Sequence, residues 1–136
     1  MIAQVSLPPI EDDPRFADAI ALFNSGDYFE ASDIFEELFF EAVRDEVPVA
    51  RALLQASVGL LHAERGQKQS AIGRLEEAII AIDAVTNARG VEFARLRESI
   101  RDVIRILSAG RGVGAPPRIM VFRAASPPSS PAGREG

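Results

Sequence analysis

Residues 27–39 read DYFEASDIFEELF, and this stretch predicts an amphipathic α-helix. At about 100° per residue, one side of that helix is an apolar arc made of Tyr28, Ala31, Phe35, Leu38, Phe39, Ala42 and Val43. Ser32 and Glu36 project from this arc, one turn apart. A buried carboxylate must find a hydrogen-bonding or charged partner. We therefore expect a polar contact in the interior at Glu36.

The pattern around this helix recurs 40 residues later in the chain. The matched positions are Gly26, Ala31 and Phe35 in the first copy and Gly66, Ala71 and Leu75 in the second. Each copy reads as a helix end, a glycine turn and a second helix, in which a small Ala allows two backbones to approach. Two such hairpins and a closing helix predict an antiparallel bundle or a short superhelical stack. The Gly-Asp-Tyr-x-x-Ala at 26–31 also looks like half of a tetratricopeptide repeat.

The fold class predicted for residues 13–109 is all-α, with about five helices in antiparallel hairpins forming a compact bundle. Asp13 and Pro14 are typical of a helix start. The second helix is expected to open with a capping box at Asp27 and to run until the approach of Pro48. The third, over 48–66, is apolar on nearly every side and should be central. The fourth opens near residue 70, and the fifth follows a break at 87–90.

The two ends of the chain are expected to lie outside this bundle. Residues 1–12 have little periodicity and two adjacent prolines, which predicts a flexible leader. Residues 110–136 comprise a Gly/Pro-rich linker, a short apolar segment at 119–122 and a flexible, disordered tail rich in Pro, Ser and Gly. We expect the apolar segment to dock on the bundle, because leaving it in water is costly. The alternative is a short peptide that binds a partner.

Composition excludes several kinds of chemistry. There are no cysteines, so disulfides, thiolate catalysis and cysteine-based metal sites are excluded. The single histidine and the lack of a Gly-x-Ser-x-Gly elbow argue against a serine hydrolase. The glycines at 110–114 follow a helix and precede prolines, unlike a phosphate-binding loop. Nothing resembles a signal peptide or a membrane span, so we expect a soluble, cytoplasmic protein.

Two segments carry a likeness to a known family. The first supplies Tyr28, Glu30, Ala31, Ser32, Asp33, Glu36 and Phe39. The second supplies Leu54-Gln55-Ala56-Ser57, Leu61-His62, Arg65 and Gly66. In order and spacing these resemble the pattern Y-x-E-A-H-E-x-x-E-x-x-W, followed by a Gln-containing helix that ends in His and a Gly-rich turn. That pattern is typical of the small all-helical bacterial proteins of domain-of-unknown-function family 309.

Some members of that family have been labelled predicted metal-dependent hydrolases, so the resemblance implies a metal site at positions 32, 36 and 62. Here Ser32 and Phe39 stand where the family has His and Trp. Serine is a poor ligand for zinc-like ions, which leaves Glu36 and His62 as metal candidates. We expect no bound metal and no other cofactor, and a metal-dependent hydrolase is the alternative function.

A structural interpretation also accounts for the polar residues inside the predicted bundle. Arg51, Gln55 and His62 share one stripe of the third helix. Ser32 and Glu36 would meet them from the second helix, forming a polar seam that fixes which helices pack together. We expect these five residues to be hydrogen-bonded to one another.

Arg97, Arg101 and Arg105 form a basic row on the fifth helix, in the half of the chain where arginines outnumber acidic residues. Glu98 and Asp102 interleave the row, and no exposed aromatic residues are predicted beside it, so we do not expect nucleic-acid binding. The expected role is a noncatalytic interaction or scaffold module that binds a protein partner or a second copy of itself. The contact would use the bundle surface, the basic face or the apolar segment.

Overall fold

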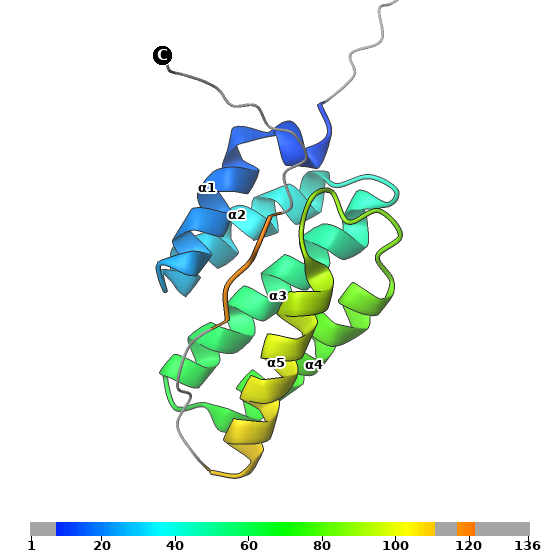
Figure 1. Ribbon diagram of the computed structural model, residues 1–136. Helices are drawn as coiled ribbons and strands as arrows, with labels where there is room; N and C mark the ends of the chain where they lie inside the picture. Colours follow the sequence, from blue (N-terminus) through cyan, green and yellow to red (C-terminus); the bar gives the residue numbers. More distant parts are fainter. Residues whose placement is uncertain (1–7, 111–116, 122–136) are drawn as a thin grey trace, which may run out of the picture.

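The computed structural model describes residues 8–110 and 117–121. Within these ranges the chain forms a short 3-10 helix and five α-helices, confirming the predicted all-α class (Figure 1). Their bounds are η1 Ile10–Asp12, α1 Pro14–Asn24, α2 Tyr28–Glu41, α3 Glu46–Glu64, α4 Lys68–Asp83 and α5 Phe93–Ser108. No helix in the described part of the chain is long and apolar enough to span a membrane.

The two predicted glycine turns build the α1–α2 and α3–α4 hairpins in the same way. Gly26 and Gly66 have φ of +85° and +73°. The residue after each glycine donates its backbone N–H across the helix end, from Asp27 to the Leu22 carbonyl and from Gln67 to the His62 carbonyl, both at 2.9 Å. This six-to-one bond is a Schellman motif, which requires the left-handed conformation that glycine adopts without strain. The internal repeat is therefore a repeat of helix-ending geometry.

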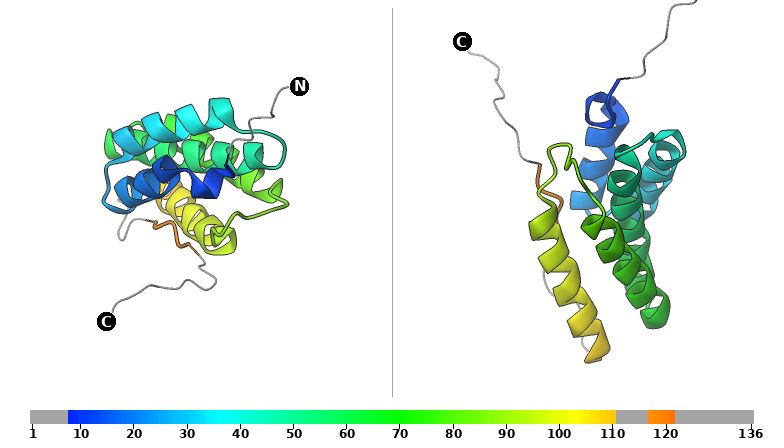
Figure 2. Two further views of the ribbon diagram at one scale, coloured as in Figure 1. Left: turned by 90° about the horizontal axis from the view of Figure 1, so that it is seen from above. Right: turned by 90° about the vertical axis from the view of Figure 1, so that its right-hand side faces the viewer.

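The interior follows the repeat. Ala31 and Ala71 are fully buried, as are Phe35 and Leu75 one turn later. As predicted, α3 is central: it packs on α2 along one side and on α4 along the other, while α1 covers α2 and α5 covers α4. Figure 2 shows α1 and α5 on the same side of this row of helices. Two helices that are distant in sequence thus cover the same side of the bundle, α1 over α2 and α5 over α4.

Two element boundaries and one helix cap differ from the prediction. Helix α2 ends at Glu41 because Ala42 is extended, well before Pro48. Pro48 lies in the first turn of α3. Backbone N–H groups in a first turn have no acceptor within the helix, so the N–H that proline lacks costs no hydrogen bond there. Asp27 precedes α2 without a side-chain capping bond, so the predicted capping box does not form, whereas Asp13 does cap α1 by accepting from the Arg15 N–H.

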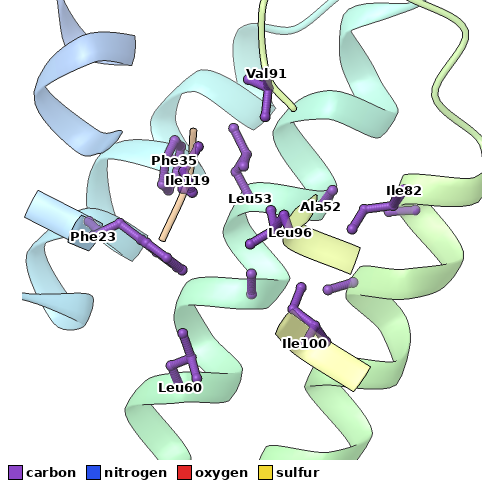
Figure 3. Close-up of a cluster of buried hydrophobic side chains, with 14 of the residues drawn as sticks. Phe23, Phe35, Ala52, Leu53, Leu60, Ile82, Val91, Leu96, Ile100 and Ile119 are labelled. Atoms are coloured by element: carbon purple, nitrogen blue, oxygen red, sulfur yellow. The ribbon is translucent and has the colours of Figure 1, made fainter. Parts of the chain in front are cut away.

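The structure also extends the folded body at both ends. The prediction of a flexible leader was wrong for residues 10–12, because Ile10–Asp12 form η1 and Ile10 is buried. At the other end, residues 117–121 run beside α5 and reach α1 (Figure 1). Ile119 belongs to the buried cluster that contains Phe23 and Leu96 (Figure 3). The predicted docking of the apolar segment is confirmed for residues 119–121; the predicted linker at 111–116 and tail at 122–136 lie outside the described residues.

Candidate functional site

The predicted polar seam does not form. Ser32 is buried, but its hydroxyl donates to the Phe29 carbonyl of its own helix at 2.7 Å. Glu36 is exposed, contrary to the expectation that it points into the interior. The buried stripe of α2 is narrower than the predicted arc, and Val43, on the same edge of that arc as Glu36, is 56% exposed beyond the helix end. Whether a residue at the margin of an amphipathic arc is buried depends on which helices pack against it. The sequence of the helix itself does not reveal this arrangement.

The remaining seam residues contact different neighbours. Arg51 is exposed, and its guanidinium carbon lies 5.3 Å from the centre of the Phe39 ring. Gln55 accepts a hydrogen bond from Arg74 of α4 at 3.2 Å. His62 is half-buried, and its Nδ1 is buried without a hydrogen-bond partner in the described structure. Arg51 and Gln55 thus face opposite neighbours of α3, which explains why no continuous seam exists.

Neither metal candidate is part of a recognisable metal site. Glu36 is exposed and His62 is half-buried. Among residues 8–110 and 117–121, no group of three or more histidine, aspartate or glutamate side chains is arranged to hold an ion. The ligand set that the resemblance implies is therefore not assembled by the described residues.

The basic face of α5 is mostly engaged in ion pairs. Arg97 binds Asp83 of α4 through two hydrogen bonds of 2.8 and 3.1 Å, and Arg105 pairs with Asp102 at 2.9 Å. The hydrogen bonds from Arg97 lower the pKa of Asp83. Arg101 and Arg105 also border an open hollow of about 530 Å³ between α4 and α5, next to Ile80, which is 62% exposed. Acidic residues of α4 and α5 thus neutralise much of the basic face.

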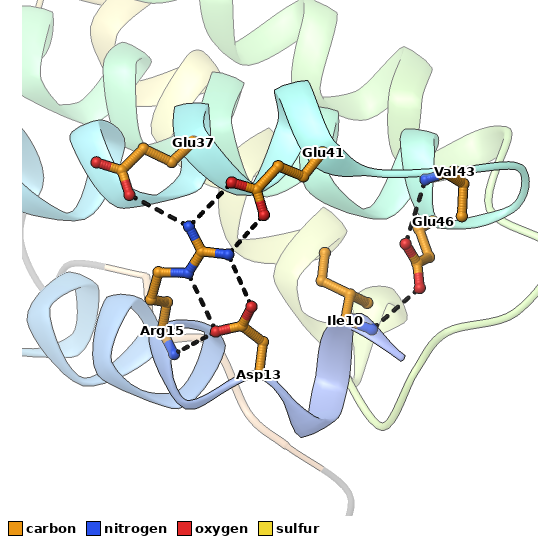
Figure 4. A network of polar contacts seen from close by, with 7 residues as sticks. All are labelled: Ile10, Asp13, Arg15, Glu37, Glu41, Val43 and Glu46. Carbon is orange, nitrogen blue, oxygen red and sulfur yellow. Dashed lines mark hydrogen bonds and ion pairs between the residues drawn. The ribbon is translucent and has the colours of Figure 1, made fainter. Parts of the chain in front are cut away.

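Among the described residues, the buried carboxylate is that of Glu46, at the start of α3. It accepts the backbone N–H of Ile10 at 3.0 Å and that of Val43 at 3.2 Å (Figure 4). Arg89 lies 3.7 Å away and also pairs with Glu11 at 3.1 Å and with Asp45. Glu46 thus holds the N-terminal segment against the α2–α3 turn, a contact that the sequence analysis missed.

A second charged cluster joins α1 to α2. Arg15 contacts Asp13 at 2.8 Å, Glu41 at 2.6 Å and Glu37 at 3.4 Å (Figure 4). The hydrogen bonds from Arg15 lower the pKa of Asp13 and of Glu41, and they raise the pKa of Arg15 itself. A hollow of about 150 Å³ lies between this cluster and Glu46. These carboxylates are committed to ion pairs, so the cluster acts as a structural tie.

Asn24, at the end of α1, binds the backbone of a residue 95 positions later in the chain. Its side-chain oxygen accepts the N–H of Ile119 at 2.7 Å, and its side-chain nitrogen donates to the carbonyl of the same residue at 3.0 Å. One amide thus satisfies both backbone groups of one residue in an extended segment. This is the pairing that a neighbouring β-strand would provide.

The other edge of the same segment is paired with the chain just before α5. The Glu92 N–H donates to the Met120 carbonyl at 2.7 Å, and Val91 and Val121 form an antiparallel bridge. Ile119 is 2% exposed, Pro117 is also buried, and Arg118 between them is exposed. We call Asn24, Val91 and Glu92 the docking site and residues 117–121 the docked segment.

The docking site binds an extended backbone through hydrogen bonds, and one aliphatic side chain of the docked segment is buried. It holds no nucleophile or acid–base pair against the docked segment, and its polar contacts are those of backbone recognition. The sequence identified the apolar residues at 119–122, but it did not single out Asn24, which lies two residues before the predicted glycine turn. No local pattern distinguishes an asparagine that ends a helix from one that also binds a distant strand.

Comparison with known proteins supports the family resemblance. Residues 16–73 match a family model described as "Domain of unknown function (DUF309)". The match runs from α1 into α4 and includes both glycine turns, whereas the docked segment lies beyond it. No curated protein matches this sequence.

Proposed function

We propose that this chain is a noncatalytic interaction module, built from two tetratricopeptide-like hairpins, that binds an extended segment of a protein partner. The observation that supports this function is the docked segment: an extended stretch of polypeptide occupies the surface between α1 and α5, with its backbone paired on both edges. Stacked helical hairpins often present such surfaces to extended ligands. Here the surface carries an amide placed to bind a backbone.

The recognition chemistry favours binding over catalysis. Asn24 and Glu92 contribute hydrogen bonds to main-chain atoms, which any extended sequence supplies. Specificity then comes from the side chain that enters the core, here Ile119. This division of roles, with main-chain bonds for affinity and a pocket for specificity, is typical of peptide recognition by strand addition.

Site-specific photo-crosslinking in the native cell tests the proposal. A photo-reactive residue at Ala94, exposed two residues after Glu92, should capture a partner, and the same residue at Glu77 on exposed α4 should not. The captured protein should be joined through an extended segment, as mass spectrometry of the linked peptides would show. Equal capture at both positions, or none at Ala94, would contradict the proposal.

Metal analysis of the purified full-length protein addresses the alternative of a metal-dependent hydrolase. A tightly held ion at one equivalent per chain, lost on replacing Glu36 or His62, would support the hydrolase and oppose a purely binding role. The noncatalytic proposal expects no stoichiometric metal, and it expects full stability in the presence of a chelator.

A further inference from the structure

Residues 117–121 occupy the docking site in the way that a ligand from another molecule would. Among residues 8–110, the segment's backbone pairs with Asn24, Val91 and Glu92, and one aliphatic side chain, Ile119, is buried. Arg118 and Val121, by contrast, remain exposed. The contacts therefore define a short recognition pattern, with buried residues at its first and third positions and an open position between them.

We propose that the docked segment is a built-in competitor, and that the docking site takes a partner segment of the same chemistry: extended, with Pro at the first position and a β-branched aliphatic residue at the third. This inference rests on the proposed function and names the ligand class of that same site. The partner's third residue presents its N–H and carbonyl to Asn24, and its fourth residue accepts the Glu92 N–H.

The side chain at the third position controls this specificity. Ile119 sits in the buried cluster with Phe23, Val91 and Leu96 (Figure 3). A carboxylate there would be desolvated, because Ile119 lies in a cluster of hydrophobic side chains and the Asn24 amide is already bonded to main chain. An Asp at the third position therefore abolishes docking in the chain and in a free peptide alike.

Tethering gives the chain's own segment an advantage over a free peptide. The segment follows α5 after a short stretch, residues 111–116, so it is present at an effective concentration on the order of millimolar. A free peptide of equal intrinsic affinity must displace it. Removing the competitor should consequently raise the apparent affinity for a peptide by at least about tenfold.

The test uses full-length protein and two fluorescent peptides. One peptide has the sequence APPRIMVF of residues 115–122, and the matched peptide has Asp in place of Ile. By fluorescence anisotropy, the Ile119→Asp chain should bind the first peptide at least about tenfold more tightly than the wild-type chain does. It should not bind the Asp peptide, and adding Asn24→Ala to it should remove binding. The matched control Arg118→Ala, at an exposed position, should behave as the wild type.

A folded Ile119→Asp chain that fails to bind the first peptide would overturn the inference, and so would one that binds both peptides equally. Should Ile119→Asp unfold the protein, wild-type protein keeps the inference testable. Excess unlabelled APPRIMVF peptide should then displace the segment of the labelled chain and shift the NMR resonance of its Ile119 N–H, which loses the bond to Asn24, and an unchanged Ile119 resonance at millimolar peptide would overturn it. Peptide binding without any cross-linked cellular partner would contradict the proposed function alone, whereas a partner captured without peptide binding would contradict this inference alone.

Discussion

Gly59 shows how one residue fixes the separation of two helices. A β-carbon added there would lie 2.7 Å from Cγ and Cδ2 of Leu75 and 3.2 Å from its backbone nitrogen. Because Cγ and the backbone cannot swing aside as a side-chain tip can, α3 and α4 would have to move apart. Glycine in the interior of a helix is otherwise unfavourable, so close packing accounts for its presence in α3.

Gly59→Ala should therefore lower the free energy of unfolding by about 1–3 kcal/mol, the usual range for overpacking, less the gain in helix propensity. Gly73→Ala is the matched control, because nothing lies within 4 Å of the added carbon in α4. It should stabilise the protein by about 0.5–1 kcal/mol. Urea denaturation of both variants measures these changes, and equal stability of the two variants would refute the packing explanation.

Glu36 and Glu46 mark the limit of residue-scale prediction. The helical wheel predicts that Glu36 projects from the apolar arc into the interior, whereas the structure leaves it exposed. Glu46 lies in the first turn of its helix, where acidic residues are common because they interact favourably with the helix dipole. Its carboxylate is nevertheless buried, and it accepts hydrogen bonds from two backbone N–H groups. Which carboxylate is enclosed depends on where the N-terminal segment lies, and periodicity within a helix carries no information about that.

At the scale of the element, the glycine signals were reliable. Gly26 and Gly66 ended helices as predicted, because a positive φ is a property of the residue itself. Helix α2 is shorter than predicted, because Pro48 does not end it: proline is compatible with a first helical turn, and Pro48 lies in the first turn of α3. The pairing of Asn24 with Ile119 was not predictable, because it spans elements at opposite ends of the chain.

The ion pairs of Arg15 between α1 and α2 should make the stability of the protein depend on pH. Asp13 and Glu41 have folded-state pKa values below their ordinary ones because both accept hydrogen bonds from Arg15. A lowered folded pKa contributes stability above the unfolded value, at about pH 4, and that contribution disappears as the pH falls through the folded value. The stability difference between wild type and Arg15→Gln should therefore be largest near neutral pH and should shrink below about pH 4.

NMR titration of the side-chain carboxyls checks the cause. In Arg15→Gln the pKa values of Asp13 and Glu41 should both rise while that of Asp83 stays unchanged. The matched variant Arg97→Gln should raise the pKa of Asp83 alone, because that carboxylate is bonded to Arg97. Unchanged titration of Asp13 and Glu41 in Arg15→Gln would show that the ion pairs are not formed in solution.

For the whole molecule, the connection between α4 and α5 joins both ends of the described chain to the helical body. Arg89 in this connection pairs with Glu11 and Asp45, on the side of the N-terminal segment. Val91 and Glu92, two and three residues later, pair with the docked segment. The hairpins could be predicted from sequence because they are formed by neighbouring segments. The attachment of the two chain ends could not, because it depends on contacts between residues far apart in the chain.

The central claim is that residues 117–121 are a separable ligand of the helical body, held by Asn24 and Glu92. Amide hydrogen exchange, measured by NMR on the wild type and on Asn24→Ala, tests this most directly. The N–H groups of Ile119 and Glu92 should be protected in the wild type and should open together at a lower free energy than the amides of α3; Asn24→Ala should accelerate both without affecting α3. Exchange of both amides only through global unfolding, or no protection of either in the wild type, would contradict the claim.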